Sequence, residues 1–415
     1  MDILIKAAKL IDGTGSRSTS DAFILIRNGK IIEIGSQNDL SENLTSGFGK
    51  FQIMDFPEGT ILPGLIETHS HMHCTGNSEA SERMLLDTEE ILIMRAVNAM
   101  RVSLLSGVTT MRDLGSLNSV AFAIKNAIIN NVIQGPRILV AGTPITTTAG
   151  HCYFFGTEVN SEKEILEAVR KQVKLGADCI KIMSTGGNFT PRSNPRRAQF
   201  SLRFLQEAVE DAHRLEVPVA SHCHGTEGII NSVNAGVDNL IHCSWISSNP
   251  SEGYDYREDV VDEIADKGIF VDPTIALGHL RQIDDPEADV FQRGGVFYDL
   301  DSRYEMLRDM WSKGVKFISG LDAGMHMGEF GTHYNSVLVM IEKMGVSPID
   351  AIKCVSKNSA ECLGILPETG TVEKGKYADL IVLSDDFEKN PNSLKQVDTV
   401  INKGVVVKKN QIPLI

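Results

Sequence analysis

The sequence predicts an α/β protein: a (β/α)8 TIM barrel with a small β-sandwich domain built from both termini. Three observations support this fold class. Eight short apolar runs alternate with amphipathic segments, both ends are rich in β patterns, and 415 residues suffice for one large domain and one smaller domain. We expect the β-sandwich domain at residues 1–58 plus 367–415 and the barrel at residues 59–366.

Both ends of the chain have hairpin patterns. Near the N-terminus, apolar runs at 23–26 and 30–34 flank the turn sequence Asn28-Gly29. Near the C-terminus, an apolar run at 378–383 precedes a run at 399–407 that contains another glycine turn. Two β-rich ends around a different middle predict one sandwich assembled from both termini.

The middle of the chain alternates short apolar runs with segments of helical period. One helical segment, 164–175, is opened by a capping box of Ser161 and Glu164, and another, 204–215, ends before Pro218. The alternation favours a closed parallel barrel, although an open doubly wound sheet also fits the pattern. No GxGxxG follows the first strand and no P-loop occurs, which disfavours nucleotide-binding folds. The eight apolar runs are residues 60–67, 109–113, 138–141, 179–183, 217–221, 240–242, 269–272 and 316–319.

The composition disfavours several kinds of partner and location. Lys+Arg is 40 and Asp+Glu is 54, so the formal net charge of −14 makes nucleic acid and membrane surfaces poor partners. Seven cysteines without a CxxC pair indicate reduced thiols. The N-terminus lacks the apolar stretch of a signal peptide, and no run reaches the roughly 18 apolar residues of a membrane span. We therefore expect a cytoplasmic protein.

Two histidines follow the first predicted barrel strand. His69 and His71 are two residues apart, so on a strand both imidazoles point the same way and can reach one cation. In a (β/α)8 barrel the carboxyl ends of the strands form the functional face. The spacing and the position together favour metal ligands over a core or surface pair.

Lys181 lies inside the fourth apolar run, where its side chain should be buried. A buried unpaired ammonium is expensive, so some group must neutralise it. One alternative is a carboxylate partner within the barrel. The other is carboxylation by CO2, and the resulting carbamate would be an anionic oxygen ligand suited to bridging two cations.

Three further strand ends carry imidazole or carboxylate groups. These are His222 and His224 after the fifth run, His242 after the sixth and Asp322 after the eighth. The neighbouring thiols of Cys223 and Cys243 should point to the other side and pack as small apolar groups. Nitrogen and oxygen ligands suit divalent metals: zinc is favoured by availability, and cobalt, manganese and nickel also fit.

Three stretches of the chain resemble signature motifs of the amidohydrolase superfamily. They are residues 63–71 (PGLIETHSH), 109–115 (TTMRDLG) and 370–380 (GTVEKGKYADL). The resemblance covers essentially the whole chain and is closest to the imidazolonepropionase-like and Xaa-Pro dipeptidase-like branch. That branch includes metal-dependent carboxypeptidases, dipeptidases and hydrolases of N-acyl amino acids.

The resemblance implies two divalent metal ions and assigns their ligands. His69, His71 and Asp322 would bind the more buried ion, His222 and His242 would bind the other, and carboxylated Lys181 (N6-carboxylysine) would bridge them. His224 and His151 match positions that contact substrate in this branch. The sequence departs from the usual motifs at Glu67, where Asp is common, and at Ala149, where relatives often have Gly.

The expected function is hydrolysis of an amide or peptide bond in a small molecule, such as a dipeptide or an N-acyl amino acid. Two cations that share a water would lower its pKa and supply hydroxide. Asp322 would take the proton and return it to the leaving amine, and His224 would stabilise the oxyanion, a role worth roughly 3 kcal/mol. Alternatives on the same scaffold are a deaminase and a hydrolase that opens a cyclic amide or lactam. A non-catalytic scaffold protein is a third reading, which the retention of every ligand disfavours.

The loops after the strands should determine the substrate. Tyr153 lies in an aromatic cluster that could wall an apolar substrate group or simply pack within its loop. Arg192, in an arginine-rich loop, could hold a carboxylate or be a solvated surface residue. Glu329 could attract a cationic side chain. A homo-oligomer is expected because relatives often assemble.

Overall fold

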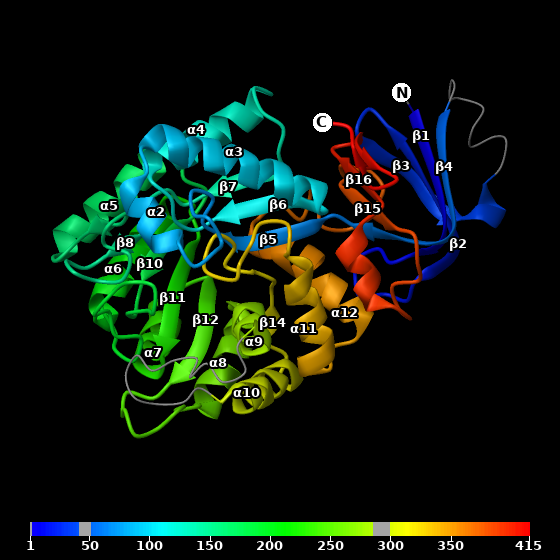
Figure 1. Cartoon of the computed structure of the whole chain (residues 1–415). Coiled ribbons are helices and arrows are strands. Elements are labelled where there is room, and N and C mark those ends of the chain that lie inside the picture. Colours follow the sequence, from blue (N-terminus) through cyan, green and yellow to red (C-terminus); the bar gives the residue numbers. More distant parts are fainter. Residues whose placement is uncertain (1, 41–50, 285–298) are drawn as a thin grey trace.

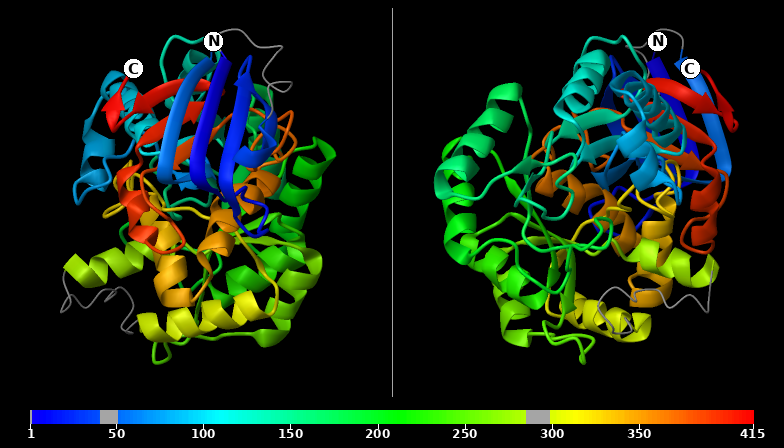
Figure 2. Two further views of the ribbon diagram at one scale, coloured as in Figure 1. Left: turned by 90° about the vertical axis from the view of Figure 1, so that its right-hand side faces the viewer. Right: turned by 60° about the vertical axis from the view of Figure 1, so that its left-hand side comes forward.

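The computed structural model describes residues 2–40, 51–284 and 299–415, which form a mixed α/β protein (Figure 1). Strands from the two ends of the chain make one eight-stranded sheet of order β18-β17-β16-β15-β4-β1-β2-β3. Figure 2 shows these blue and red strands side by side at one end of the molecule. The strands are β1 (Asp2–Leu10), β2 (Thr19–Arg27), β3 (Lys30–Ser36), β4 (Phe51–Pro63), β15 (Leu380–Leu383), β16 (Thr399–Asn402), β17 (Val405–Lys409) and β18 (Ile412–Pro413).

Both predicted hairpins are confirmed. Strands β2 and β3 pair antiparallel across Asn28-Gly29, and β16 and β17 pair antiparallel across Lys403-Gly404. Asn28 and Lys403 adopt positive φ angles of 52° and 49°, as turns between such short-linked strands require. The N- and C-terminal strands join through β4 and β15, which pair antiparallel.

The run at 60–67 is not one barrel strand, as the sequence predicted, but two strands in different sheets. Residues up to Pro63 belong to β4 of the terminal sheet, and β5 (Leu65–Ser70) belongs to a parallel sheet. Gly64 lies between the two strands. Its backbone packs so closely against Thr109 that a Cβ at this position would lie 2.1 Å from Thr109 Oγ1. The close backbone approach that this glycine permits marks the change of sheet.

The middle of the chain contains two parallel sheets. One has the order β5-β6-β7, with β6 (Val108–Asp113) and β7 (Arg137–Val140). The other has the order β14-β13-β12-β11-β10-β8-β9. It is made of β8 (Ile145–Thr146), β9 (Thr157–Glu158), β10 (Ile180–Met183), β11 (Val219–Gly225), β12 (Asn239–Ile246), β13 (Phe270–Asp272) and β14 (Lys316–Phe317). Seven of the eight predicted runs therefore coincide with strands, and the two-residue strands β8 and β9 were not predicted.

Backbone hydrogen bonds connect the two parallel sheets on both sides. Asp178 N donates to Val140 O across 2.8 Å, which joins the start of β10 to the end of β7. On the other side, Ala323 N donates to His69 O across 3.0 Å, and His71 N donates to Ala323 O across 2.7 Å. The segment after β14 is thereby fixed against the carboxyl end of β5.

Helices lie outside these strands in the views of Figures 1 and 2. Ser161 caps α5 by accepting from Glu164 N, as predicted, and α6 ends at Arg214 before Pro218. The helices are α2 (Ala80–Leu86), α3 (Glu89–Leu105), α4 (Asn118–Ile129), α5 (Glu162–Leu175), α6 (Leu202–Arg214), α7 (Thr226–Ala235), α8 (Glu258–Lys267), α9 (Ile275–Asp284), α10 (Leu300–Ser312), α11 (Tyr334–Met344), α12 (Pro348–Lys353) and α13 (Ser359–Cys362). Within the described ranges, no helix combines the length and apolar character needed to cross a bilayer.

Candidate active site

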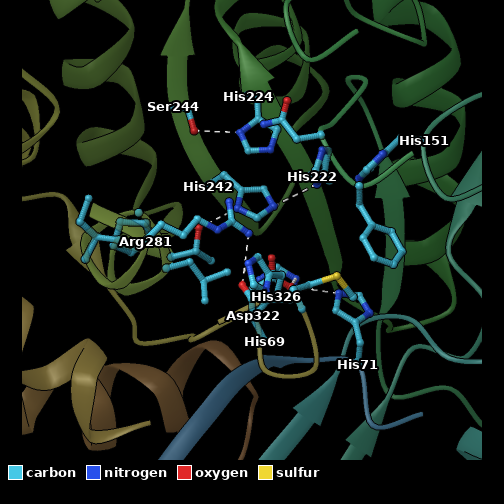
Figure 3. Close-up of a pocket in the computed structure, with 18 of the residues that line it drawn as sticks. His69, His71, His151, His222, His224, His242, Ser244, Arg281, Asp322 and His326 are labelled. Atoms are coloured by element: carbon cyan, nitrogen blue, oxygen red, sulfur yellow. Dashed lines mark hydrogen bonds and ion pairs between the residues drawn. The ribbon is translucent and has the colours of Figure 1, made fainter. Parts of the chain in front are cut away.

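A cavity of about 640 Å³ opens at the carboxyl ends of the parallel strands. It gathers residues from β5, β10, β11 and β12 together with the segments that follow β13 and β14. Figure 3 shows its imidazole groups converging from these separate elements. Eight of the ten candidate site residues line it: His69, His71, His151, Lys181, His222, His224, His242 and Asp322.

The first cluster consists of His69, His71 and Asp322. Asp322 Oδ1 lies 3.3 Å from His69 Nε2 and 3.2 Å from His71 Nε2. His71 Nδ1–H donates to Gly115 O across 2.8 Å, so Nε2 is the ring nitrogen that faces this cluster. One ligand atom from each of the three side chains lies within 4.8 Å of the others, as a shared cation requires.

The second cluster consists of His222, His224 and His242. His222 Nδ1 and His242 Nε2 lie 3.0 Å apart, and the rings of His224 and His242 stack with centroids 4.3 Å apart. His222 Nε2–H donates to Gly186 O across 3.1 Å, which leaves the lone pair of Nδ1 facing His242. The resemblance placed His224 with the substrate, but in the structure its ring also belongs to this group of possible metal ligands. Its Nδ1 lies 2.9 Å from Ser244 Oγ.

Burial favours the neutral form of His69, His222, His224 and His242. It lowers the pKa of His69, His222 and His242 well below 6.5, and neighbouring cationic groups, including Lys181, lower it further. Burial likewise lowers the pKa of His224 to about 3. Neutral imidazoles carry the lone pairs that metal ions bind.

Lys181 lies on β10 and is 1% exposed. Its Nζ makes no hydrogen bond within the described ranges of the chain. Burial lowers its pKa to about 8, against the attraction of Asp322. Lys181 also lowers the pKa of His69 in one cluster and His242 in the other, so its amine is electrostatically coupled to both.

Two of these side chains are held by unusual backbone conformations. His242 and Asp322 have φ angles of 67° and 62°, in the left-handed region that non-glycine residues rarely adopt. Such strain persists only where surrounding contacts enforce it, and it is concentrated at functional sites. Both of these side chains line the cavity.

His151 is buried at the cavity, with its ring 4.6 Å from that of His222. It packs over Gly187, where a Cβ would lie 2.4 Å from His151 Nε2. The structure places the other two predicted substrate contacts elsewhere. Tyr153 and Arg192 are exposed and do not line the cavity, because the loop segments that carry them turn outward.

Three features of the site escaped the sequence reasoning. Asp272 ends β13 and lies 3.7 Å from His69 Nδ1, and burial raises its pKa to about 7. Its place at a strand end was the signal that could have identified it. Glu67 pairs with His333, and Arg281 of α9 lines the cavity, but both arrangements depend on contacts between distant segments.

The residues present fit a pair of divalent metal ions. Two compact groups of nitrogen and oxygen donors lie beside a buried amine that has no hydrogen-bond partner in the described parts of the chain. Neutral imidazoles and a carboxylate are donors that zinc and similar metals bind. The alternative of an ion-paired lysine is not favoured, since no ion pair involves Lys181 within those parts.

Comparisons with known proteins agree with this geometry. The amidohydrolase family profile matches residues 60–407. An ochratoxinase from Aspergillus niger is 26% identical over 423 residues, covering 94% of this chain and 81% of that protein. A 5-methylthioadenosine/S-adenosylhomocysteine deaminase from Bacillus cereus is 23% identical over 415 residues, covering 92% of this chain and 84% of that protein.

A solved structure has the same fold along nearly the entire chain. A Xaa-Pro dipeptidase with bound methionine in its active site aligns with a TM-score of 0.85 and 28% identity, covering 98% of this chain and 100% of that one. Members of the matched family generally use metal ions, and this chain has the donor groups to bind them. The chain belongs to the amidohydrolase family and is a hydrolase that acts on carbon–nitrogen bonds.

Proposed function

We propose that this enzyme hydrolyses an amide or peptide bond of a small molecule, such as a dipeptide or an N-acyl amino acid, using two divalent metal ions. The observation that carries the proposal is the position of Lys181. Its buried amine has no hydrogen-bond partner among the described residues, and it is electrostatically coupled to both histidine clusters. A carboxylated lysine at this position would supply an anionic oxygen ligand suited to bridging two ions.

The ligand assignment follows the two clusters. His69, His71 and Asp322 would hold one ion, His222 and His242 the other, and N6-carboxylysine at Lys181 would be shared. Zinc is the favoured metal, and cobalt or manganese suit the same donors. When bound, the two ions supply a water of lowered pKa and polarise the scissile carbonyl.

The chain's own residues would handle the proton and the developing charge. Asp322 would accept the proton from the attacking water and return it to the leaving amine. His224 would donate from Nε2 to the carbonyl oxygen as negative charge develops there, because Ser244 Oγ holds its Nδ1 at 2.9 Å. His151, which is buried at the cavity, would contact the substrate.

We further propose the finer architecture. The hydrogen bonds between the two parallel sheets support a closed (β/α)8 barrel at residues 59–366. The sheet shared by the two termini supports one small domain at 1–58 plus 367–415, for which we keep the proposal of a β-sandwich. Seven free cysteines, all buried, suit a cytoplasmic location. A homo-oligomer remains our expectation from the resemblance.

A second candidate function is deamination or opening of a cyclic amide, which the similarity to a deaminase favours. One experiment separates the two. The purified enzyme, loaded with zinc, cobalt or manganese, is incubated with dipeptides, N-acyl amino acids, aminopurines and lactams, with metal-free protein as control. Release of free amino acids from dipeptides or N-acyl amino acids at two metals per chain supports our proposal. Release of ammonia from aminopurines, or ring opening of lactams, at one metal per chain supports the alternative. Metal-loaded enzyme without activity on any amide contradicts the proposal.

A further inference from the structure

Arg281 brings a positive charge to the cavity from a helix rather than from the end of a strand. It lies on α9, and Figure 3 shows its side chain reaching towards His242 and Asp322. Its Nη2 donates to His326 O across 3.2 Å, which fixes the direction of the guanidinium. Burial lowers the pKa of Arg281 against the attraction of Asp322 in the first cluster, and Arg281 contributes to lowering the pKa of His224 in the second.

The other cationic side chains that line the cavity already have other roles. The Arg303 guanidinium donates to the backbone carbonyls of His242 and Cys243, the former bond being very short and the latter 2.7 Å. Arg303 therefore binds the backbone of β12. Lys181, in the proposed function, is carboxylated and carries negative charge. Among the described cationic residues that line the cavity, Arg281 is the one whose position suits a substrate anion.

Two leucines line the same cavity as Arg281, one on α9 and one at the start of α10. Leu277 precedes Arg281 by four residues, so both side chains lie on one face of α9, and both line the cavity. Leu300, at the start of α10, lines the cavity beside them. Glu329, which could have drawn a cationic group, is exposed and does not line the cavity. This wall therefore combines one positive charge with an apolar surface.

We propose that Arg281 binds the α-carboxylate of the substrate's amino-acid half, while Leu277 and Leu300 contact its apolar side chain. The inference rests on the proposed function and narrows its substrate class. The α-carboxylate lies next to the carbon attached to the scissile nitrogen in both dipeptides and N-acyl amino acids. A planar guanidinium fork matches a carboxylate in two parallel hydrogen bonds, which Lys or Gln cannot reproduce.

The test compares substrates that differ only in this charge. Kinetics of the zinc-loaded enzyme are measured on glycyl-L-leucine against glycyl-L-leucinamide, and on N-acetyl-L-leucine against N-acetyl-L-leucinamide. We expect the wild type to have a higher kcat/KM on the free acids than on the carboxamides. The pair with the higher kcat/KM, dipeptide or N-acetyl amino acid, shows which class of substrate supplies the carboxylate. Arg281→Gln should reduce this preference by about 10- to 100-fold, with little change for the carboxamides. Arg17→Gln, which alters an exposed arginine, is the matched control.

Binding of the product gives a second measurement that needs no turnover. L-Leucine should raise the melting temperature of the wild type more than L-leucinamide, and Arg281→Gln should abolish the difference. Arg281→Lys keeps the charge without the fork and should show a partial loss, which decides the matter if the Gln variant does not fold. Hydrolysis with an unchanged acid preference in a folded Arg281 variant overturns this inference and leaves the proposed function standing. Failure of the wild type on all four substrates and on every other amide of the substrate screen overturns the proposed function itself.

Discussion

His333 Nδ1 lies 2.7 Å from Glu67 Oε2, and both side chains are buried. The same carboxylate accepts hydrogen bonds from His69 N at 2.9 Å and from Leu321 N at 3.0 Å. Glu67 therefore ties together the two backbone segments that carry the proposed ligands His69 and Asp322. The same side chain contacts His333 at the start of α11.

Replacement of Glu67 should destabilise the protein and loosen the first metal cluster. Glu67→Ala leaves two buried backbone N–H groups without acceptors, each costing about 1–3 kcal/mol. We expect the free energy of unfolding to fall by at least about 2 kcal/mol, with weaker zinc binding. Urea unfolding and zinc titration measure both effects, and Glu58→Ala, at an exposed position, is the control. Equal stability of the two variants would contradict the role of this contact.

Asp322→Asn should retain metal and lose turnover. The amide oxygen can still act as a ligand, but the side chain can no longer take a proton from the attacking water. We expect kcat to fall by about 10²- to 10⁴-fold at an unchanged metal content. Metal analysis and initial rates are compared with Asp55→Asn, which changes an exposed carboxylate. A variant with full metal content and wild-type rates would rule out Asp322 as the proton carrier.

Formation of the metal site should depend on CO2 and on pH through Lys181. Only the neutral amine reacts with CO2, and the lowered pKa of about 8 makes that form accessible near neutrality. Reactivation of metal-free enzyme by zinc and bicarbonate should therefore accelerate as the pH rises through about 8. Lys181→Gln should bind less metal and lose activity, with partial rescue by short carboxylic acids. Normal metal content and activity in this variant would refute a carboxylated lysine.

The metal-free protein should become less stable as the pH falls below 6.5. His69, His151, His222 and His242 have pKa values well below 6.5 in the folded state, so the unfolded chain binds more protons in this range. As the pH falls below 6.5, the free energy of unfolding then decreases by about 1.4 kcal/mol per pH unit for each histidine. Urea unfolding between pH 8 and pH 5 measures the slope. A flat profile would mean that these imidazoles are not buried and neutral.

Local pattern determined the positions of the proposed ligands. On a strand, side chains two residues apart share a face, and parallel strands present their carboxyl ends at one edge. These two rules alone predicted that His69, His71, His222, His242 and Asp322 would converge, and the structure brings them together. The burial of Lys181 followed equally from its apolar neighbours, and it is 1% exposed.

Tertiary structure decided what surrounds those ligands. The sequence pointed to Arg192 for a carboxylate, yet that side chain is exposed, and the cavity instead receives Arg281 from a helix. The contact between Glu67 and His333 likewise joins segments far apart in the chain. The direction of a strand residue is fixed by backbone geometry within a few residues. Which loop or helix side chain reaches a cavity depends instead on how whole elements pack, and no local pattern encodes that.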